Sequence, residues 1–140
     1  MSKNEIIPQI NEVNRISSGT EFRGTLISSC DIRIDGFFVG KIQTKGKVVI
    51  GETAQFIGDL YCSNSDIWGK MEGNIFSGNQ SGFKSKAIFS GTLQCHKIFI
   101  EEGAQFNGTC KMITEEEYNQ IISKVNASEK RDDKDRDQLS

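Results

Sequence analysis

Few side chains in this sequence of 140 residues are suited to chemistry: one histidine, four cysteines and one loop between glycines. His96 directly follows Cys95, and neighbours on a strand point to opposite faces, so the two are not placed as a base and its nucleophile. The segment GKVVIG (residues 46–51) lacks the GxxxxGK[ST] pattern of a phosphate-binding loop. We therefore predict no catalytic residue.

The cysteines do not predict a metal site either. They show no CxxC spacing and are accompanied by a single histidine, whereas structural zinc needs four such ligands at short spacings. We expect no metal and no cofactor. The four cysteines are Cys30, Cys62, Cys95 and Cys110.

Charge and hydropathy restrict the partners and the location. The formal net charge is −2, which does not favour nucleic acid as a partner. No apolar run reaches the roughly 18 residues of a membrane span, and the first residues lack the apolar core of a secretion signal. We expect a cytoplasmic protein.

A repeat centred on glycine organises the elements that hold these side chains. Each unit has Phe or Met two residues before a glycine and Leu, Ile or Cys two residues after it, and the glycines are 15–18 residues apart. Internal periodicity of this kind is the mark of a repeat architecture. The units are FRGTL (22–26), FVGKI (38–42), FIGDL (56–60), MEGNI (71–75), FSGTL (89–93) and FNGTC (106–110).

Other apolar positions recur with the same period, and we call each set of equivalent positions a column. One column lies eight residues before the glycines, and only the fourth unit, which is the shortest, breaks it. If that unit has lost two residues relative to the others, Ile67, six residues before Gly73, takes the equivalent position. Most residues between the columns are polar, and alternation with period 2 is the signal of a strand. The column contains Ile16, Ile32, Ile50, Ser65, Phe83 and Ile100.

These observations predict an all-β, single-stranded β-helix (a β-solenoid) of about six turns over residues 15–112. Successive turns would stack about 4.8 Å apart, like residue upon like. A sandwich is less compatible, because its hairpins favour Asn-Gly or Asp-Gly turns every 8–12 residues. Two roles remain open for the glycines: an inward position where walls approach closely, or a positive φ at a corner.

The segments outside the repeat are expected to be less ordered. Residues 1–14 are a flexible arm or a peptide that touches a membrane through Ile6, Ile7 and Ile10, and both interpretations remain open. Residues 113–140 are expected to be a charged, mostly disordered tail, with a brief helix after a capping box at Thr114 and Glu117. Residues 129–137 are nine consecutive charged residues, which favours disorder.

Two stretches resemble the bactofilins, bacterial cytoskeletal proteins with a β-helical core and disordered ends. They are DIRIDGFFVGKIQTKGKVVIGETAQFIGDL (31–60) and IFIEEGAQFNGTCKM (98–112), and the resemblance covers about residues 15–112. It implies a right-handed β-helix that polymerises end to end without nucleotide. It also implies a scaffold near the inner membrane that recruits cell-wall enzymes and influences cell shape.

The ends of a solenoid give a physical reason for such self-assembly. Each end exposes backbone N–H and C=O groups that pair with another strand unless they are capped, and the sequence contains no strong cap. We predict contacts between copies through Ile16 and Phe22 at one end and Ile98, Ile100 and Phe106 at the other. Ordinary core packing explains the same five residues equally well.

Two other functions are compatible with parts of the sequence. IGETAQFIGDL (50–60) can be divided into two hexapeptide turns of an acyltransferase, but this period does not continue through residues 61–100, and the only candidate base is His96. A non-polymerising docking module, whose tail from Thr114 binds a partner, is the second alternative.

Overall fold

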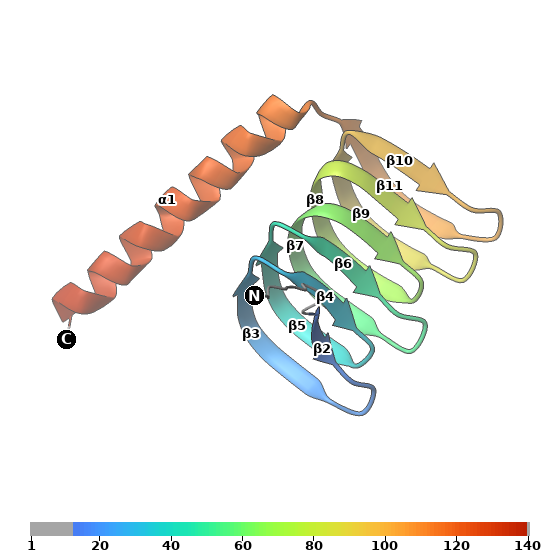
Figure 1. Ribbon diagram of the computed structural model, residues 1–140, viewed down its shortest axis with the longest axis horizontal. Helices are drawn as coiled ribbons and strands as arrows, with labels where there is room; N and C mark the ends of the chain where they lie inside the picture. The colour runs from blue at the N-terminus through green and yellow to red at the C-terminus, as the bar shows by residue number, and fades with distance from the viewer. Residues whose placement is uncertain (1–12, 140) are drawn as a thin grey trace, which may run out of the picture.

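The computed structural model describes residues 13–139 and is a β-solenoid of about six turns followed by one helix (Figure 1). The predicted all-β solenoid is therefore confirmed. Every strand pair is parallel, as expected when each turn lies on the preceding one. The helix is α1 (Glu115–Leu139); it begins beside the C-terminal end of the solenoid, and its C-terminal half projects away from the turns (Figure 1).

Each turn contains a short and a long stretch of strand. The short stretches are β2 (Val13–Ile16), β4 (Asp31–Ile34), β6 (Lys47–Ile50) and β10 (Lys97–Ile100). The long stretches are β3 (Glu21–Ser28), β5 (Phe37–Thr44), β9 (Ile88–Cys95) and β11 (Gln105–Met112). In β7 (Gln55–Ile67) and β8 (Lys70–Phe83) one continuous strand supplies both stretches.

The register confirms the columns around the glycines. Phe22 pairs with Phe38, which pairs with Phe56, and the column continues through Met71 and Phe89 to Phe106. The column two residues after the glycines is also continuous, from Leu26 to Cys110. In the interior turns these side chains are buried and form the core. Examples with no exposed surface are Phe38, Phe56, Phe89, Ile42, Leu60 and Ile75.

The predicted column eight residues before the glycines was wrong in the second unit. The structure aligns Ile16, Ile34, Ile50 and Ile67, whereas Ile32 lies in the neighbouring inward column with Val48 and Ser65. The column then continues to Phe83 and Ile100.

The error has a simple cause in the corners that precede the long stretches. These corners contain four residues in most turns, for example 51–54, but only two at 35–36 and 68–69. A two-residue corner places the inward residue six rather than eight positions before the glycine. Together with the corners that precede the short stretches, which contain two residues in most turns but one at Ser63 and at His96, this variation produces the irregular spacing of the repeat.

The structure decides the role of the repeated glycines, which stand where the long stretches bend. Gly58 has φ of +141°, a conformation that L side chains rarely adopt, and its counterparts in other turns have nearly the same value. A Cβ atom at Gly58 would overlap the carbonyl oxygen of Gly40 in the preceding turn. Both the positive φ and the close approach therefore require glycine at these positions. The close approach is between the backbones of successive turns, not between opposite walls of one turn.

Small polar and sulfur side chains occupy another inward column. Cys62 and Cys95 are fully buried, and they lie two turns apart with Ser77 between them. Ser77 donates a hydrogen bond to the carbonyl oxygen of Ser63 at 2.8 Å, so its burial leaves the hydroxyl satisfied. These cysteines are therefore core residues.

The C-terminal tail differs from the expected disordered segment. The predicted capping box is present: Glu117 N–H donates to Thr114 Oγ1 at 3.1 Å, and Thr114 N–H donates to Glu117 Oε1 at 3.2 Å. The helix that it starts extends to Leu139, much longer than the brief helix predicted. No glycine or proline follows Gly108, and Glu, Lys and Arg are good helix formers, so nothing in this segment stops the helix.

We expect Gly58→Ala to destabilise the fold by about 2–6 kcal/mol, because it adds a strained φ and an overlap with the preceding turn. Gly19→Ala is the matched control: Gly19 also has positive φ, at +86°, but no atom lies within 4 Å of its Cβ position. Its cost should be about 1–3 kcal/mol. Chemical unfolding followed by circular dichroism measures both, and equal costs would contradict the stacking constraint.

Candidate polymerisation interface

Each end of the solenoid presents strands that are paired on one edge only. At the N-terminal end β2 pairs with β4 and β3 pairs with β5; at the C-terminal end β10 pairs with β8 and β11 pairs with β9. Within residues 13–139 no strand covers the outer edges of β2, β3, β10 and β11. Their backbone N–H and C=O groups are thus available to another strand.

The N-terminal end exposes part of the core. Ile16, Phe22 and Leu26 pack against the core cluster but are only half-buried, whereas their partners one turn further in have no exposed surface. The Phe22 ring stacks on Phe38 with centroids 4.8 Å apart and planes within 12°, and no described strand pairs with β3 on the opposite edge to supply a second ring. These partners are Ile34, Phe38 and Ile42.

The C-terminal end is open in the same way. Phe106 and Ile98 are half-buried, and Ile100 is 46% exposed although it lies in an inward column. The Phe106 ring contacts Phe89 at 5.1 Å and the edge of Phe83 at 5.4 Å, both within the chain. All five predicted interface residues therefore lie in the two terminal turns, two at one end and three at the other.

Sequence analysis missed other apolar side chains of the same ends. Leu26 and Ala104 are half-buried against the core, and Met112 is 55% exposed. Leu26 belongs to the column two residues after the glycines, and Met112 pairs with the inward Cys95, so extending the prediction to every inward position of the terminal turns would have found both. Ile6, Ile7 and Ile10, the candidate membrane contacts, lie outside the described residues.

The glycine column also ends openly at the N-terminal turn. A Cβ atom at Gly40, Gly58 or Gly108 would overlap a carbonyl oxygen of the turn before it. At Gly24 the same atom would meet only the Phe22 ring, at 3.7 Å, because no described turn precedes it. The space in front of Gly24 is therefore available to a backbone approaching as closely as successive turns do.

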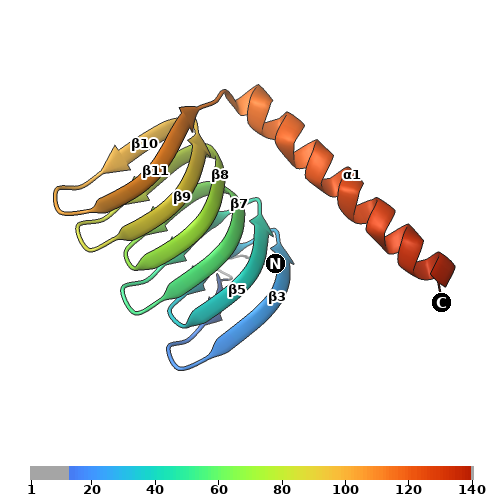
Figure 2. The ribbon, with the colours of Figure 1, turned by 180° about the vertical axis from the view of Figure 1, so that it is seen from behind.

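The helix does not close the C-terminal end. Ile113 is buried and its N–H donates to the carbonyl oxygen of Cys95 at 2.8 Å, which directs the chain to the side of the solenoid. From there α1 runs beside the turns and not across β11 (Figure 2). His96 is exposed whereas Cys95 is buried, and the Nδ1 atom of His96 lies 3.2 Å from the carbonyl oxygen of Ile113.

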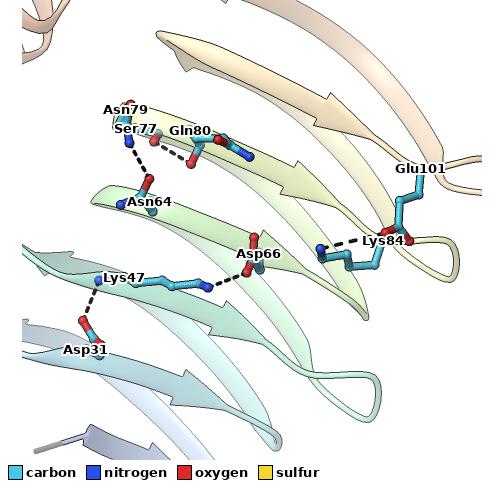
Figure 3. Close-up of polar contacts among 9 residues, drawn as sticks. All are labelled: Asp31, Lys47, Asn64, Asp66, Ser77, Asn79, Gln80, Lys84 and Glu101. Atoms are coloured by element: carbon cyan, nitrogen blue, oxygen red, sulfur yellow. Dashed lines mark hydrogen bonds and ion pairs between the residues drawn. The ribbon is translucent and has the colours of Figure 1, made fainter. Parts of the chain in front are cut away.

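Polar contacts between turns line the outer surface of the short stretches (Figure 3). The Lys47 ammonium lies 2.7 Å from Asp66, Asn79 donates to Asn64 at 2.9 Å, and Lys84 lies 3.9 Å from Glu101. Exposed pairs of this kind contribute about 0–1 kcal/mol each, so they adjust stacking rather than determine it. In each of these three pairs the two residues lie in adjacent turns, which is the pattern of a structural ladder.

A surface groove of about 500 Å³ adjoins this ladder and contains Trp68. Four of its charged side chains form two pairs: Arg33 Nε donates to Asp35 at 2.9 Å, and Lys47 pairs with Asp66. Within the described chain, no three His, Cys, Asp or Glu side chains gather where they could hold a metal ion. The open ends are accordingly the feature that most needs a functional explanation.

A protein-family model described as "Bactofilin: Polymer-forming cytoskeletal" matches residues 14–111, which is nearly the whole solenoid. The chain belongs to the bactofilin family. The chain is also 27% identical over 97 residues to bactofilin BacO of Myxococcus xanthus (strain DK1622), which covers 69% of this chain and 77% of that protein. No solved structure matches the chain. Membership confirms the predicted resemblance and identifies a polymer-forming cytoskeletal family.

We predict that maleimide modifies Cys110 rapidly in the unassembled protein, because this thiol is exposed at the open C-terminal turn. Burial raises the pKa of Cys95 to about 12 and also raises the pKa of Cys62, so these thiols stay protonated and enclosed until the protein unfolds. If another copy covers the end, assembly should slow modification of Cys110 at least tenfold. Mass spectrometry of labelled peptides measures the rates, with Cys110→Ser as the control that assigns the signal.

A Cys110 thiol that reacts as slowly as Cys62 before assembly would contradict the open end. Unchanged labelling of Cys110 in polymers would show that this end is not the contact.

Proposed function

We propose that this bactofilin assembles end to end, through its two terminal turns, into filaments that form without nucleotide. The observation that supports this most directly is the exposure of one column at its two ends: Phe22 and Phe106 are half-buried, whereas Phe38, Phe56 and Phe89 between them have no exposed surface. A second copy placed on either end would supply the missing neighbour.

The physical gain comes from two sources. Stacking pairs the free backbone edges of the terminal strands, and it removes the remaining exposed surface of Phe22, Leu26, Phe106 and Ile98 from water. Completing the burial of one such side chain contributes about 1 kcal/mol, since full burial contributes about 1.5–3 kcal/mol. Neither source involves a phosphate or a bound nucleotide.

We propose further that the filaments serve as a scaffold near the inner membrane for cell-wall or cell-shape functions, with cell-wall enzymes as recruited partners. The support is family membership together with the isoleucines at positions 6, 7 and 10. The helix of the described chain is not apolar enough to cross a membrane, so we propose that attachment is peripheral. A filament repeats a weak anchor many times, and this multiplies its effect.

Phe106→Arg should prevent filament formation, because it places a charge in the apolar column at the open end. Asn107→Arg is the matched control: it adds the same charge on the same strand, but at an exposed residue between two inward columns. Negative-stain microscopy should show filaments for the wild type and Asn107→Arg, and none for Phe106→Arg. Circular dichroism must show equal β-structure in both variants.

The N-terminal end is tested with Phe22→Arg against Thr25→Arg, an exposed residue of the same strand. Filaments formed by both Phe variants would contradict end-to-end assembly, as would a wild type that remains monomeric at high concentration and moderate salt.

Replacing Ile6, Ile7 and Ile10 together by serine should abolish cosedimentation of filaments with vesicles of phosphatidylethanolamine and phosphatidylglycerol. The apolar contribution to interfacial binding comes from these side chains. The Phe106→Arg monomer should bind the same vesicles at least tenfold more weakly than the filament, because it presents only one anchor. Equal binding by the serine variant would refute the proposed anchor and leave polymerisation untouched.

A further inference from the structure

The flank of the solenoid beneath α1 is unusually apolar for an outer surface. Tyr61 lies between the inward residues Leu60 and Cys62 and therefore points outward, yet it is only 9% exposed. Its ring stacks on Phe76 of the next turn, with centroids 4.8 Å apart and planes within 6°. Lys41 Nζ lies 5.5 Å from the centre of the Tyr61 ring, and α1 packs on the same flank through Tyr118 at Gly78.

Contacts at two points fix α1 on this flank. The Tyr118 ring lies over Gly78, where a Cβ atom would come within 2.9 Å of it, so the missing side chain of Gly78 makes room for the ring. Eight residues further on, Asn126 Oδ1 accepts a hydrogen bond from Gln43 Nε2 at 2.8 Å. Gln43, Tyr61 and Phe76 occupy one outward column, so α1 runs along the stack of turns.

The helix meets the flank with a single apolar stripe. Tyr118, Ile121, Ile122 and Val125 follow the i, i+3, i+4, i+7 pattern, and all four are half-buried. The neighbouring Gln120 and Lys124 are exposed. This is the recognition pattern of an amphipathic helix in a groove.

The fit of α1 to the flank is incomplete. Gln43 Oε1 is buried without a hydrogen-bond partner within the described part of the chain, although its amide group faces Asn126. A cavity of about 380 Å³ remains beside the first turns of the helix, and His96, Asn79 and Glu115 are among its lining residues. None of the four apolar stripe residues is fully buried.

We propose that this flank is a docking groove for an amphipathic helix and that α1 is its resident, displaceable occupant. The partner is a protein that presents a helix with an aromatic residue followed by branched aliphatic residues three, four and seven positions later. A helix that also brings a hydrogen-bond donor to Gln43 Oε1 fits better than α1, because Asn126 Oδ1 accepts only from Gln43 Nε2 and leaves that oxygen without a partner in the described chain.

Displacement leaves the solenoid intact, because α1 joins it only through the connection after β11, where buried Ile113 is anchored. The groove lies on the side of the stack and leaves both ends free. A polymer can therefore carry docked partners along its length, and the groove does not require polymerisation.

The test measures binding of a fluorescein-labelled peptide of residues 114–127 to the full-length chain by fluorescence anisotropy. In Tyr118→Asp the resident helix loses its main contact, so the peptide should bind at least tenfold more tightly than to the wild type. Gln120→Asp is the matched control, with the same acidic side chain at an exposed position, and should bind as the wild type does. Adding Gly78→Val to Tyr118→Asp should abolish binding, because it fills the space for the tyrosine ring.

Circular dichroism verifies that each variant retains its β-structure. If Tyr118→Asp loses its β-structure, Ile122→Asp replaces it in the same test. Equal peptide affinity for the wild type and the released variants would overturn the proposal. Undiminished binding after Gly78→Val, or no binding to any variant, would overturn it as well. Assembly-deficient Phe106→Arg protein should give the same ranking, which separates this result from any failure of filament formation.

Discussion

The fold depends on how closely the glycines of successive turns approach one another. At each bend of the long stretches, the carbonyl oxygen of one glycine occupies the position that a Cβ atom of the next would need, as at Gly40 and Gly58. The positive φ of these residues is the backbone geometry that allows the bend. With the bends aligned, the residues on both sides fall into register, and the rings of Phe22, Phe38 and Phe56 stack on one another. The core is consequently a set of columns rather than a central cluster.

The last residue of each column has a stacking neighbour on one side only. Phe22 and Phe106 pack on one side as Phe56 does on both, and the strands that carry them pair on one edge only. Within the described residues, the open turns follow from the repetition of a unit on which no further strand is stacked at either end. The flank differs in this respect, because α1 already occupies it and shields Tyr61 from water.

Much of the fold could be predicted from the sequence, because residues that stack in successive turns recur at a regular spacing along the chain. The glycine period and the alternating apolar residues were sufficient for the solenoid, its columns and the five residues at its ends. Ile34 was missed because corner length is set by local turn geometry, which the column pattern does not contain. The length of α1 was missed because a run of mixed charges fits disorder and a solvated helix equally well. The burial of Tyr61 could not be predicted, since it depends on where a distant helix packs.

The most direct test of the account is the axial structure of the filament, measured by cryo-electron microscopy or fibre diffraction. If terminal turns stack as internal turns do, the 4.8 Å spacing continues across every junction, and each copy of about six turns occupies about 29 Å of filament length. A gap at the junctions, or copies joined side by side with their terminal turns exposed to solvent, would contradict it.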